Sequence, residues 1–132
     1  MGSTTVAFRA VQRPPVRPGA RVSVACNAAI AARYPELVED ILATGHEIIA
    51  HSTDMNGTIA SGLPRDAEAA LIGEALDTLE RVTGTRPRGW HSIARSQSFN
   101  TPQLLVEAGV EYMCDWVNDE LPVTFTTPAG AI

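Results

Sequence analysis

Short apolar runs of strand length alternate with longer amphipathic stretches along most of this chain. Residues 21–26 alternate as a strand does, and residues 46–50 form a second short apolar run. Between them, residues 28–43 are typical of a helix. A long helical pattern follows, in which Pro64 suits the opening position and Gly84 the stop. Strands that alternate with helices in this way predict a parallel sheet with crossover helices.

Cap and turn residues set the boundaries of the first helical stretch. Asn27 is suited to cap it, because its side-chain oxygen can accept a hydrogen bond from a free backbone N–H of the first turn. Pro35 is expected to start a second helical segment, and Gly45 to stop it. A loop rich in Ser, Thr, Asn and Gly then extends to Gly62.

The second half of the chain repeats the same alternation. Residues 88–92 and 110–114 predict strands, and Thr101-Pro102 opens a helix between them that ends before Gly109. A last short strand is expected at residues 123–126. The fold class is therefore α/β, with about four to five parallel strands and crossover helices.

The first twenty residues do not follow this alternation. Residues 11–19 contain three prolines, which remove sheet donors and bias the preceding residues away from helix. We therefore expect residues 1–20 to form a proline-rich arm or linker, and residues 21–132 to form the folded domain.

Length and charge narrow the classes of function. At 132 residues the chain is short for a complete α/β barrel, which usually needs about 200 residues or more. Its formal charge of -5 is spread over interleaved acidic and basic residues, which argues against a nucleic-acid or membrane partner. The N-terminus lacks the charged and apolar regions of a signal peptide, so we expect a cytoplasmic protein.

The two cysteines, Cys26 and Cys114, each close an apolar run and are far apart in the sequence. This spacing matches neither a metal knuckle nor a redox motif. We expect both to be buried, reduced thiols.

The histidines around the second apolar run, His46 and His51, superficially resemble a zinc-protease helix. That motif needs histidines four residues apart, whereas these are five apart. A helix would turn them about 140° from one another, and a strand would place them on opposite faces. His46 is interpreted as structural, while His51, at the end of a strand, is the functional candidate, with a structural role as the alternative.

Four motifs follow one another in order along the chain. They are Gly45-His46-Glu47-Ile48-Ile49-Ala50-His51, Thr83-Gly84-Thr85-Arg86-Pro87-Arg88-Gly89-Trp90, residues 104–112, and residues 114–122, which begin Cys114-Asp115-Trp116. Together they resemble the polysaccharide deacetylase family, carbohydrate esterase family 4. The resemblance is strongest to the branch that holds allantoinases, cyclic-imide hydrolases and peptidoglycan deacetylase-like enzymes.

The resemblance implies a distorted (β/α)7 deacetylase-type barrel, of which this chain would be a part. It also implies hydrolysis of C–N bonds other than peptide bonds, as in the removal of N-acetyl groups from amino sugars. An Asp-His-His metal site is part of the family pattern, with His51 as one ligand and a second histidine four residues later.

The sequence departs from this pattern in three places. Met55 stands where the second histidine is expected, and a thioether is a poor zinc ligand beside hard oxygen donors. The paired aspartates of the first motif are absent, since no Asp precedes Asp40, and no late Leu-x-His motif follows. We therefore expect either no cofactor or a divalent metal such as zinc at an atypical site.

The resemblance and the position of the loops after the strands together give candidate roles to seven residues. His51 is a base or metal ligand, and Asp54 orients it or binds the metal. The resemblance implies that Arg86 orients an aspartate of the first motif and that Asp115 orients a catalytic group. Trp90, His91 and Trp116 are candidates for substrate contact. The alternatives are a packing role for Arg86, a core position for Trp90 and a solvated turn for Asp115.

Three functions remain open from the sequence. The first is a hydrolase of amide or imide bonds in a small molecule or N-acetylated sugar, incomplete as an isolated chain. The second is a catalytically inactive fragment, and the third is a small-molecule binding module that uses the same groove. Because a partial barrel leaves two sheet edges open, we also expect homo-oligomers.

Overall fold

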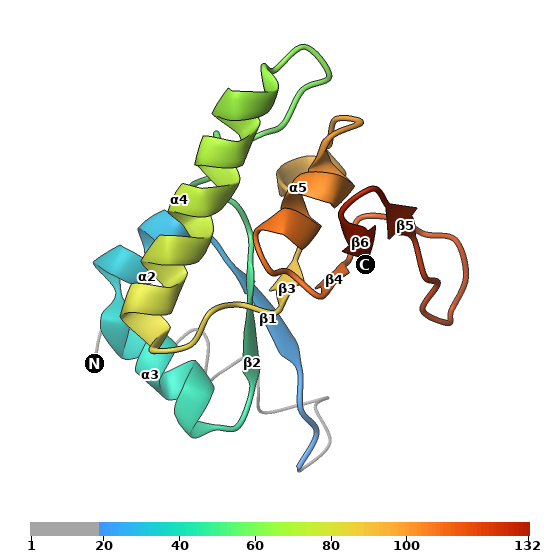
Figure 1. Ribbon diagram of the computed structural model, residues 1–132. Helices are drawn as coiled ribbons and strands as arrows, with labels where there is room; N and C mark the ends of the chain where they lie inside the picture. The colour runs from blue at the N-terminus through green and yellow to red at the C-terminus, as the bar shows by residue number, and fades with distance from the viewer. Residues whose placement is uncertain (1–18) are drawn as a thin grey trace.

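A layer of helices covers one face of a four-stranded parallel sheet in the computed structural model, which describes residues 19–132 (Figure 1). Apart from Gly19 and Ala20, the proline-rich arm expected at residues 1–20 lies outside the described residues. The helical layer and the sheet are those of the α/β class that the alternating pattern predicted.

The sheet consists of β1 (Ser23–Cys26), β2 (Glu47–Ala50), β3 (Gly89–Trp90) and β4 (Tyr112–Met113), in the order β1-β2-β3-β4. All three pairings are parallel, and the register runs from Cys26 through Ala50 and Trp90 to Met113. Because each new strand is added on the same side of the last, the winding is that of a barrel and not of a doubly wound sheet.

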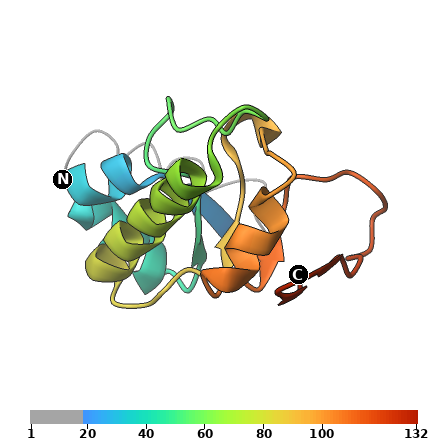
Figure 2. The same cartoon turned by 45° about the horizontal axis from the view of Figure 1, so that its top comes forward.

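Four helices connect the strands: α2 (Ala28–Arg33), α3 (Pro35–Ala43), α4 (Arg65–Thr83) and α5 (Thr101–Glu107). Asn27 caps α2 as expected, its Oδ1 accepting the backbone N–H of Ile30 at 2.9 Å. The left-handed Gly84 ends α4, with φ of 79°. The long helix α4 packs against α2, α3 and α5, so the helices form one continuous layer (Figures 1 and 2).

The core lies between this helical layer and the sheet. Its largest fully buried apolar side chains come from α3, α4, β3 and α5, and they are Ile41, Ile72, Leu76, Leu79, Trp90 and Leu105. Burying one such aliphatic side chain stabilises a fold by about 1.5–3 kcal/mol. The strand ends are therefore held on a packed support.

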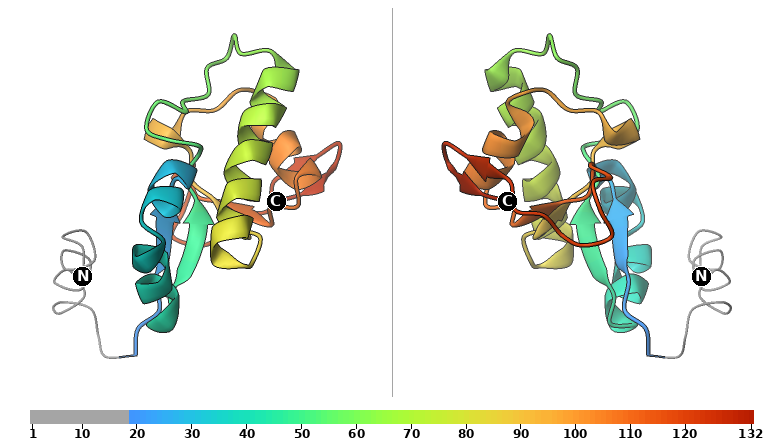
Figure 3. Two further views of the ribbon diagram at one scale, coloured as in Figure 1. Left: turned by 90° about the vertical axis from the view of Figure 1, so that its left-hand side faces the viewer. Right: turned by 90° about the vertical axis from the view of Figure 1, so that its right-hand side faces the viewer.

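The fifth parallel strand that was expected near the end of the chain is not found. Residues 123–126 do not join the main sheet. Instead, β5 (Thr126–Thr127) and β6 (Gly130–Ala131) form an antiparallel hairpin against α5. Figure 3 shows this hairpin on the opposite side of the molecule from α2 and α3. The two residues between β5 and β6 allow only a tight reversal, and Gly130 adopts a positive φ of 141°.

Cys26 is buried and reduced as expected, whereas Cys114 is reduced but exposed. The expectation failed for Cys114 because it lies just past the short edge strand β4, where no further strand of the described residues covers it. Desolvation of the sulfur and, to a smaller extent, the charge of Asp115 raise the pKa of the Cys114 thiol. A raised pKa disfavours the reactive thiolate.

Among residues 19–132, no helix is both long and apolar enough to cross a lipid bilayer.

Candidate functional site

Polar side chains from three neighbouring strands meet where those strands end. His51 follows β2, His91 and Ser92 follow β3, and Asp115 lies two residues after β4. We call these four residues the strand-end cluster. The carboxyl ends of parallel strands are where α/β proteins place their active sites.

The imidazole of His51 is held by the backbone of the next strand. Its Nδ1 lies 2.7 Å from the carbonyl oxygen of His91. A carbonyl oxygen can only accept, so Nδ1 carries the proton and the Nε2 of the neutral ring keeps its lone pair. The rings of His51 and His91 are stacked, with centroids 5.2 Å apart and planes within 9°. His51 is thus oriented to present one basic nitrogen.

Asp115 is buried and fixes the end of β3 through Ser92. One carboxylate oxygen accepts the Ser92 backbone N–H at 2.7 Å, and the other accepts the Ser92 hydroxyl at 2.6 Å. The indole N–H of Trp90 donates to the same hydroxyl at 2.8 Å. Since an indole N–H can only donate, the hydroxyl proton of Ser92 is directed at Asp115.

His91 lies at the exposed side of this arrangement. Its Nδ1 is 3.3 Å from the carbonyl oxygen of Cys114 and 3.6 Å from Oδ1 of Asp115. The second distance exceeds that of a hydrogen bond, so these two groups form an ion pair only when His91 is protonated. Within the strand-end cluster, Asp115 thus binds Ser92 through two hydrogen bonds, and the orienting role expected for it stays a prediction.

Backbone strain gathers at the same end of the sheet. Ser52, Ala94 and Arg95 are the non-glycine residues of the described chain with positive φ, at 62°, 52° and 55°. Ser52 directly follows His51, and the other two lie in the turn after Ser92. Such conformations cost about 1–3 kcal/mol each and persist where the surroundings fix them, often at functional sites.

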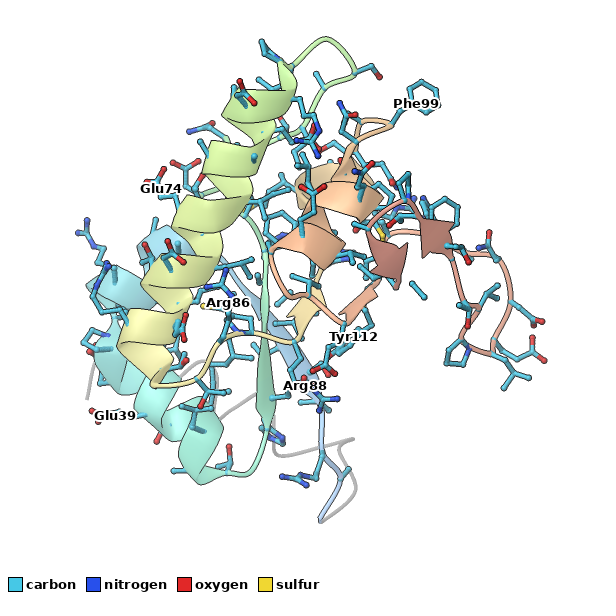
Figure 4. All side chains as sticks on the ribbon, viewed as in Figure 1. Glu39, Glu74, Arg86, Arg88, Phe99 and Tyr112 are labelled. Atoms are coloured by element: carbon cyan, nitrogen blue, oxygen red, sulfur yellow. The ribbon has the colours of Figure 1, made fainter. Side chains whose placement is uncertain are left out.

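Two of the predicted catalytic residues make their hydrogen bonds outside the strand-end cluster. The carboxylate of Asp54 accepts the backbone N–H of Asn56 at 2.7 Å and forms an exposed turn. Arg86 precedes β3, at the opposite end of the sheet, as Figure 4 shows. Its guanidinium binds Asp77 and Glu80 of α4 at 2.9 and 3.0 Å.

Arg86 also donates to the carbonyl oxygen of Ala108 at 3.1 Å, so it joins α4 to the end of α5. Its hydrogen bond to Asp77 is the main cause that raises the pKa of the guanidinium. These contacts correspond to the packing alternative for Arg86.

Trp90 has no exposed surface and packs in the core, which is the alternative stated for it in the sequence analysis. Its side chain lies on the same face of the sheet as Ala50 and Met113, its partners in register, and this face is the one that the helices cover. A groove-lining role needs exposed surface, and in this structure Trp90 has none.

Trp116, in contrast, is partly exposed and borders a hollow of about 420 Å³. Its ring meets that of Phe125 edge to face, with centroids 4.7 Å apart. Phe99 lines the same hollow, and its side chain projects outward in Figure 4. None of the four residues of the strand-end cluster lines this hollow, so the substrate contact expected for Trp116 stays a prediction.

Two polar residues important for this region were not identified from the sequence. Ser92 had no distinguishing signal, because its partner Asp115 is 23 residues away. Glu68 is fully buried in the first turn of α4, where it accepts hydrogen bonds from Ser98, at 2.6 Å, and from Thr101. From the sequence alone, a glutamate in the first turn of a helix is expected to be exposed to solvent.

The donor set does not fit the metal site that the family resemblance implies. Among residues 19–132, no three His, Cys, Asp or Glu side chains are close enough to hold an ion. Met55 is exposed, and the carboxylate of Asp54 is engaged in its turn. His51 and His91 cannot chelate together, because a metal lies in the plane of each ligating imidazole and these planes are parallel.

The fold and the strand-end cluster show that this chain forms part of a barrel-type α/β protein, with its candidate site at the carboxyl ends of the strands. Similar solved structures identify that barrel. The allantoinase PuuE is 27% identical and has a TM-score of 0.73, and the match covers 96% of this chain and 38% of that chain. A protein described as a probable polysaccharide deacetylase from Pseudomonas aeruginosa PAO1 is 27% identical over 97% of this chain and 41% of that chain, with a TM-score of 0.78.

A third structure shows the fold alone. It is a carbohydrate esterase family 4 pseudoenzyme from Bacillus anthracis, with 9% identity and a TM-score of 0.69, matched over 83% of this chain and 37% of that chain. The resemblance to the polysaccharide deacetylase family, including its allantoinase branch, is therefore confirmed. The α/β barrel class is confirmed with it.

This chain spans about two fifths of the length of these structures, with 37% to 41% of each covered. No protein-family model matches the sequence, and no curated protein matches it.

Proposed function

We propose that this chain provides the strand-end face of a hydrolase that cleaves C–N bonds other than peptide bonds. The expected substrates are small amides or imides, or N-acetylated sugars. The observation that carries the proposal is the orientation of His51, whose Nδ1–H is bound to the His91 carbonyl so that Nε2 is basic. The similarity to an allantoinase and to a protein described as a deacetylase supports the reaction class.

The chemistry assigns His51 the role of general base. Amide hydrolysis needs a water molecule made nucleophilic, a polarised carbonyl and a protonated leaving nitrogen. Nε2 of His51 takes a proton from the water as the water oxygen attacks the carbonyl carbon, and the imidazolium gives that proton to the leaving nitrogen as the C–N bond breaks. Trp116 supplies an apolar surface against which a substrate ring can pack. We propose that this step uses no metal bound by His51, because the donors around it do not converge.

Hydrolysis of three substrate types tests the proposal: allantoin, a cyclic imide and an N-acetylglucosamine oligomer, each with zinc and with a chelator. We expect turnover of one type in both conditions. His51→Ala is expected to lose about 10²–10⁴-fold in rate, the usual contribution of a general base. Ser23→Ala is the control, since it removes a hydroxyl at the other end of the sheet. No turnover of any substrate would contradict the activity, and equal turnover by His51→Ala would contradict the site.

A small-molecule binding module is the second candidate, and the hollow beside Trp116 favours it. Its volume of about 420 Å³ lies within the range of ligand pockets, roughly 300–1,000 Å³. Allantoin or the sugar oligomer would then raise the melting temperature without being hydrolysed. Replacing Trp116 by alanine would remove that stabilisation.

We also propose that the chain self-associates through its sheet edges. Within residues 19–132, β1 and β4 each pair with a strand on one side only. Large apolar side chains are exposed next to β4, namely Trp116, Val117, Leu121, Val123 and Phe125. Unpaired edges and apolar patches both favour association with another chain. Sedimentation at micromolar concentration should show a species larger than a monomer, and a stable monomer would contradict this.

A further inference from the structure

The end of β3 is fixed by a chain of hydrogen bonds that runs from the core to the strand-end cluster. Trp90, fully buried, donates its indole N–H to the Ser92 hydroxyl at 2.8 Å. Ser92 donates both its hydroxyl and its backbone N–H to Asp115, at 2.6 and 2.7 Å. His91 lies between Trp90 and Ser92 in the sequence, so both of its neighbours are held by these hydrogen bonds.

This arrangement controls His51 through the backbone of His91. The His91 N–H donates to the carbonyl of Ala50 at 2.8 Å, which joins the His91 peptide to β2. The His91 carbonyl, adjacent to the Ser92 N–H in the same peptide unit, accepts Nδ1–H of His51 at 2.7 Å. Since a peptide unit is planar, fixing the Ser92 N–H on Asp115 also fixes the direction of the His91 carbonyl.

We infer that Ser92 is a positioning residue for His51, with Trp90 and Asp115 as its supports. Ser92 is 1% exposed and cannot contact a substrate, so its influence must pass through the His91 peptide. It keeps the proton of His51 on Nδ1 and the lone pair on Nε2. The effect of Ser92 on catalysis rests on the proposed function. Its effect on the His51 tautomer does not, because the tautomer can be observed without any substrate.

Histidine tautomers are measured directly by correlating imidazole nitrogens with carbon-bound ring protons in protein with ¹⁵N-labelled histidine. The measurement is made at about pH 8.5, well above the ordinary histidine pKa of about 6.5. In the wild-type protein we expect His51 to show a single Nδ1–H form. Ser92→Ala keeps the backbone N–H but removes the hydroxyl that holds the second oxygen of Asp115, so the carboxylate is no longer fixed opposite that N–H. The nitrogen shifts of His51 should then move towards each other, as they do when the two tautomers exchange.

Two further variants distinguish a specific effect on the orientation of His51 from a general loss of structure. Trp90→Phe keeps an aromatic ring but removes the indole N–H, and a smaller shift in the same direction is expected. Ser23→Ala removes another serine hydroxyl that binds a carboxylate, that of Glu47, at the amino end of the sheet. It should leave the His51 shifts unchanged. Circular dichroism confirms that each variant is folded, and if Ser92→Ala does not fold, Trp90→Phe provides the test.

Unchanged His51 shifts in both Ser92→Ala and Trp90→Phe would overturn the inference. A change in Ser23→Ala as large as that in Ser92→Ala would overturn it too, because the effect would then not be specific to β3. If wild-type protein shows the Nδ1–H form but hydrolyses nothing, the proposed function fails while the positioning role stands. If it does hydrolyse, Ser92→Ala should lower kcat with little change in KM.

Discussion

Replacing Asp115 by alanine should cost this fold a large part of its stability. The carboxylate accepts two hydrogen bonds from Ser92, and its side chain has no exposed surface. Hydrogen bonds to charged groups contribute about 1.5–3 kcal/mol each, and a buried donor left unpaired costs about 1–3 kcal/mol. Because the two bonds share one carboxylate and are not additive, we expect a loss of roughly 3–5 kcal/mol in the free energy of unfolding.

Urea denaturation monitored by circular dichroism measures this loss. With a slope of about 2 kcal/mol per M, the midpoint should fall by roughly 1.5–2.5 M. Asp115→Asn is the matched variant, since its amide oxygen can still accept the Ser92 N–H while its NH₂ group cannot accept the hydroxyl. It should lose less than half as much as Asp115→Ala. A loss below about 1 kcal/mol for the alanine variant, or equal losses for both, would show that the Asp115 carboxylate does not stabilise the fold through these two bonds.

Three further predictions concern the sheet itself. Burial of the Tyr112 phenol and its hydrogen bond to Glu47 raise its pKa to about 12, so absorbance titration should show late ionisation. Because the folded state holds this proton more tightly, its contribution to stability is complete below about pH 10 and falls as the pH rises towards 12. Gly89→Ala should lower the melting temperature, at a cost of about 1–3 kcal/mol, because the new Cβ would lie 2.5 Å from the Tyr112 ring and 2.7 Å from Ile49. Ala25→Pro should weaken self-association in sedimentation runs while Ala25→Ser retains it, because the Ala25 N–H faces the open edge of β1. Equal association by both variants would contradict the use of the β1 edge.

Local chemistry in the sequence was sufficient to predict most of the elements. Asn27, Pro35 and Gly84 act within one helical turn of their own positions, and each sets a boundary close to where it was expected. The strand-end position of His51 also follows from a short apolar run. The parallel order of the strands follows from their alternation with helices, which requires crossover connections.

Partners distant in the sequence could not be predicted in the same way. The contact of Ser92 with Asp115 depends on the pairing of β3 with β4, and no local pattern encodes it. From the sequence, Trp90 could line a substrate groove or lie in the core. Its register with Ala50 places it on the face of the sheet that the core covers. Arg86 follows the family motif in sequence, yet among the described residues its charge partners lie on α4.

The most direct test of the central claim is the rate of C–N hydrolysis by wild-type protein and by His51→Ala with a metal chelator present. We expect turnover of allantoin, a cyclic imide or an N-acetylated sugar by the wild type, and a rate about 10²–10⁴-fold lower for the variant. Wild-type activity that the chelator abolishes, or that the variant retains in full, would contradict the assignment of His51 as a base oriented by the His91 carbonyl.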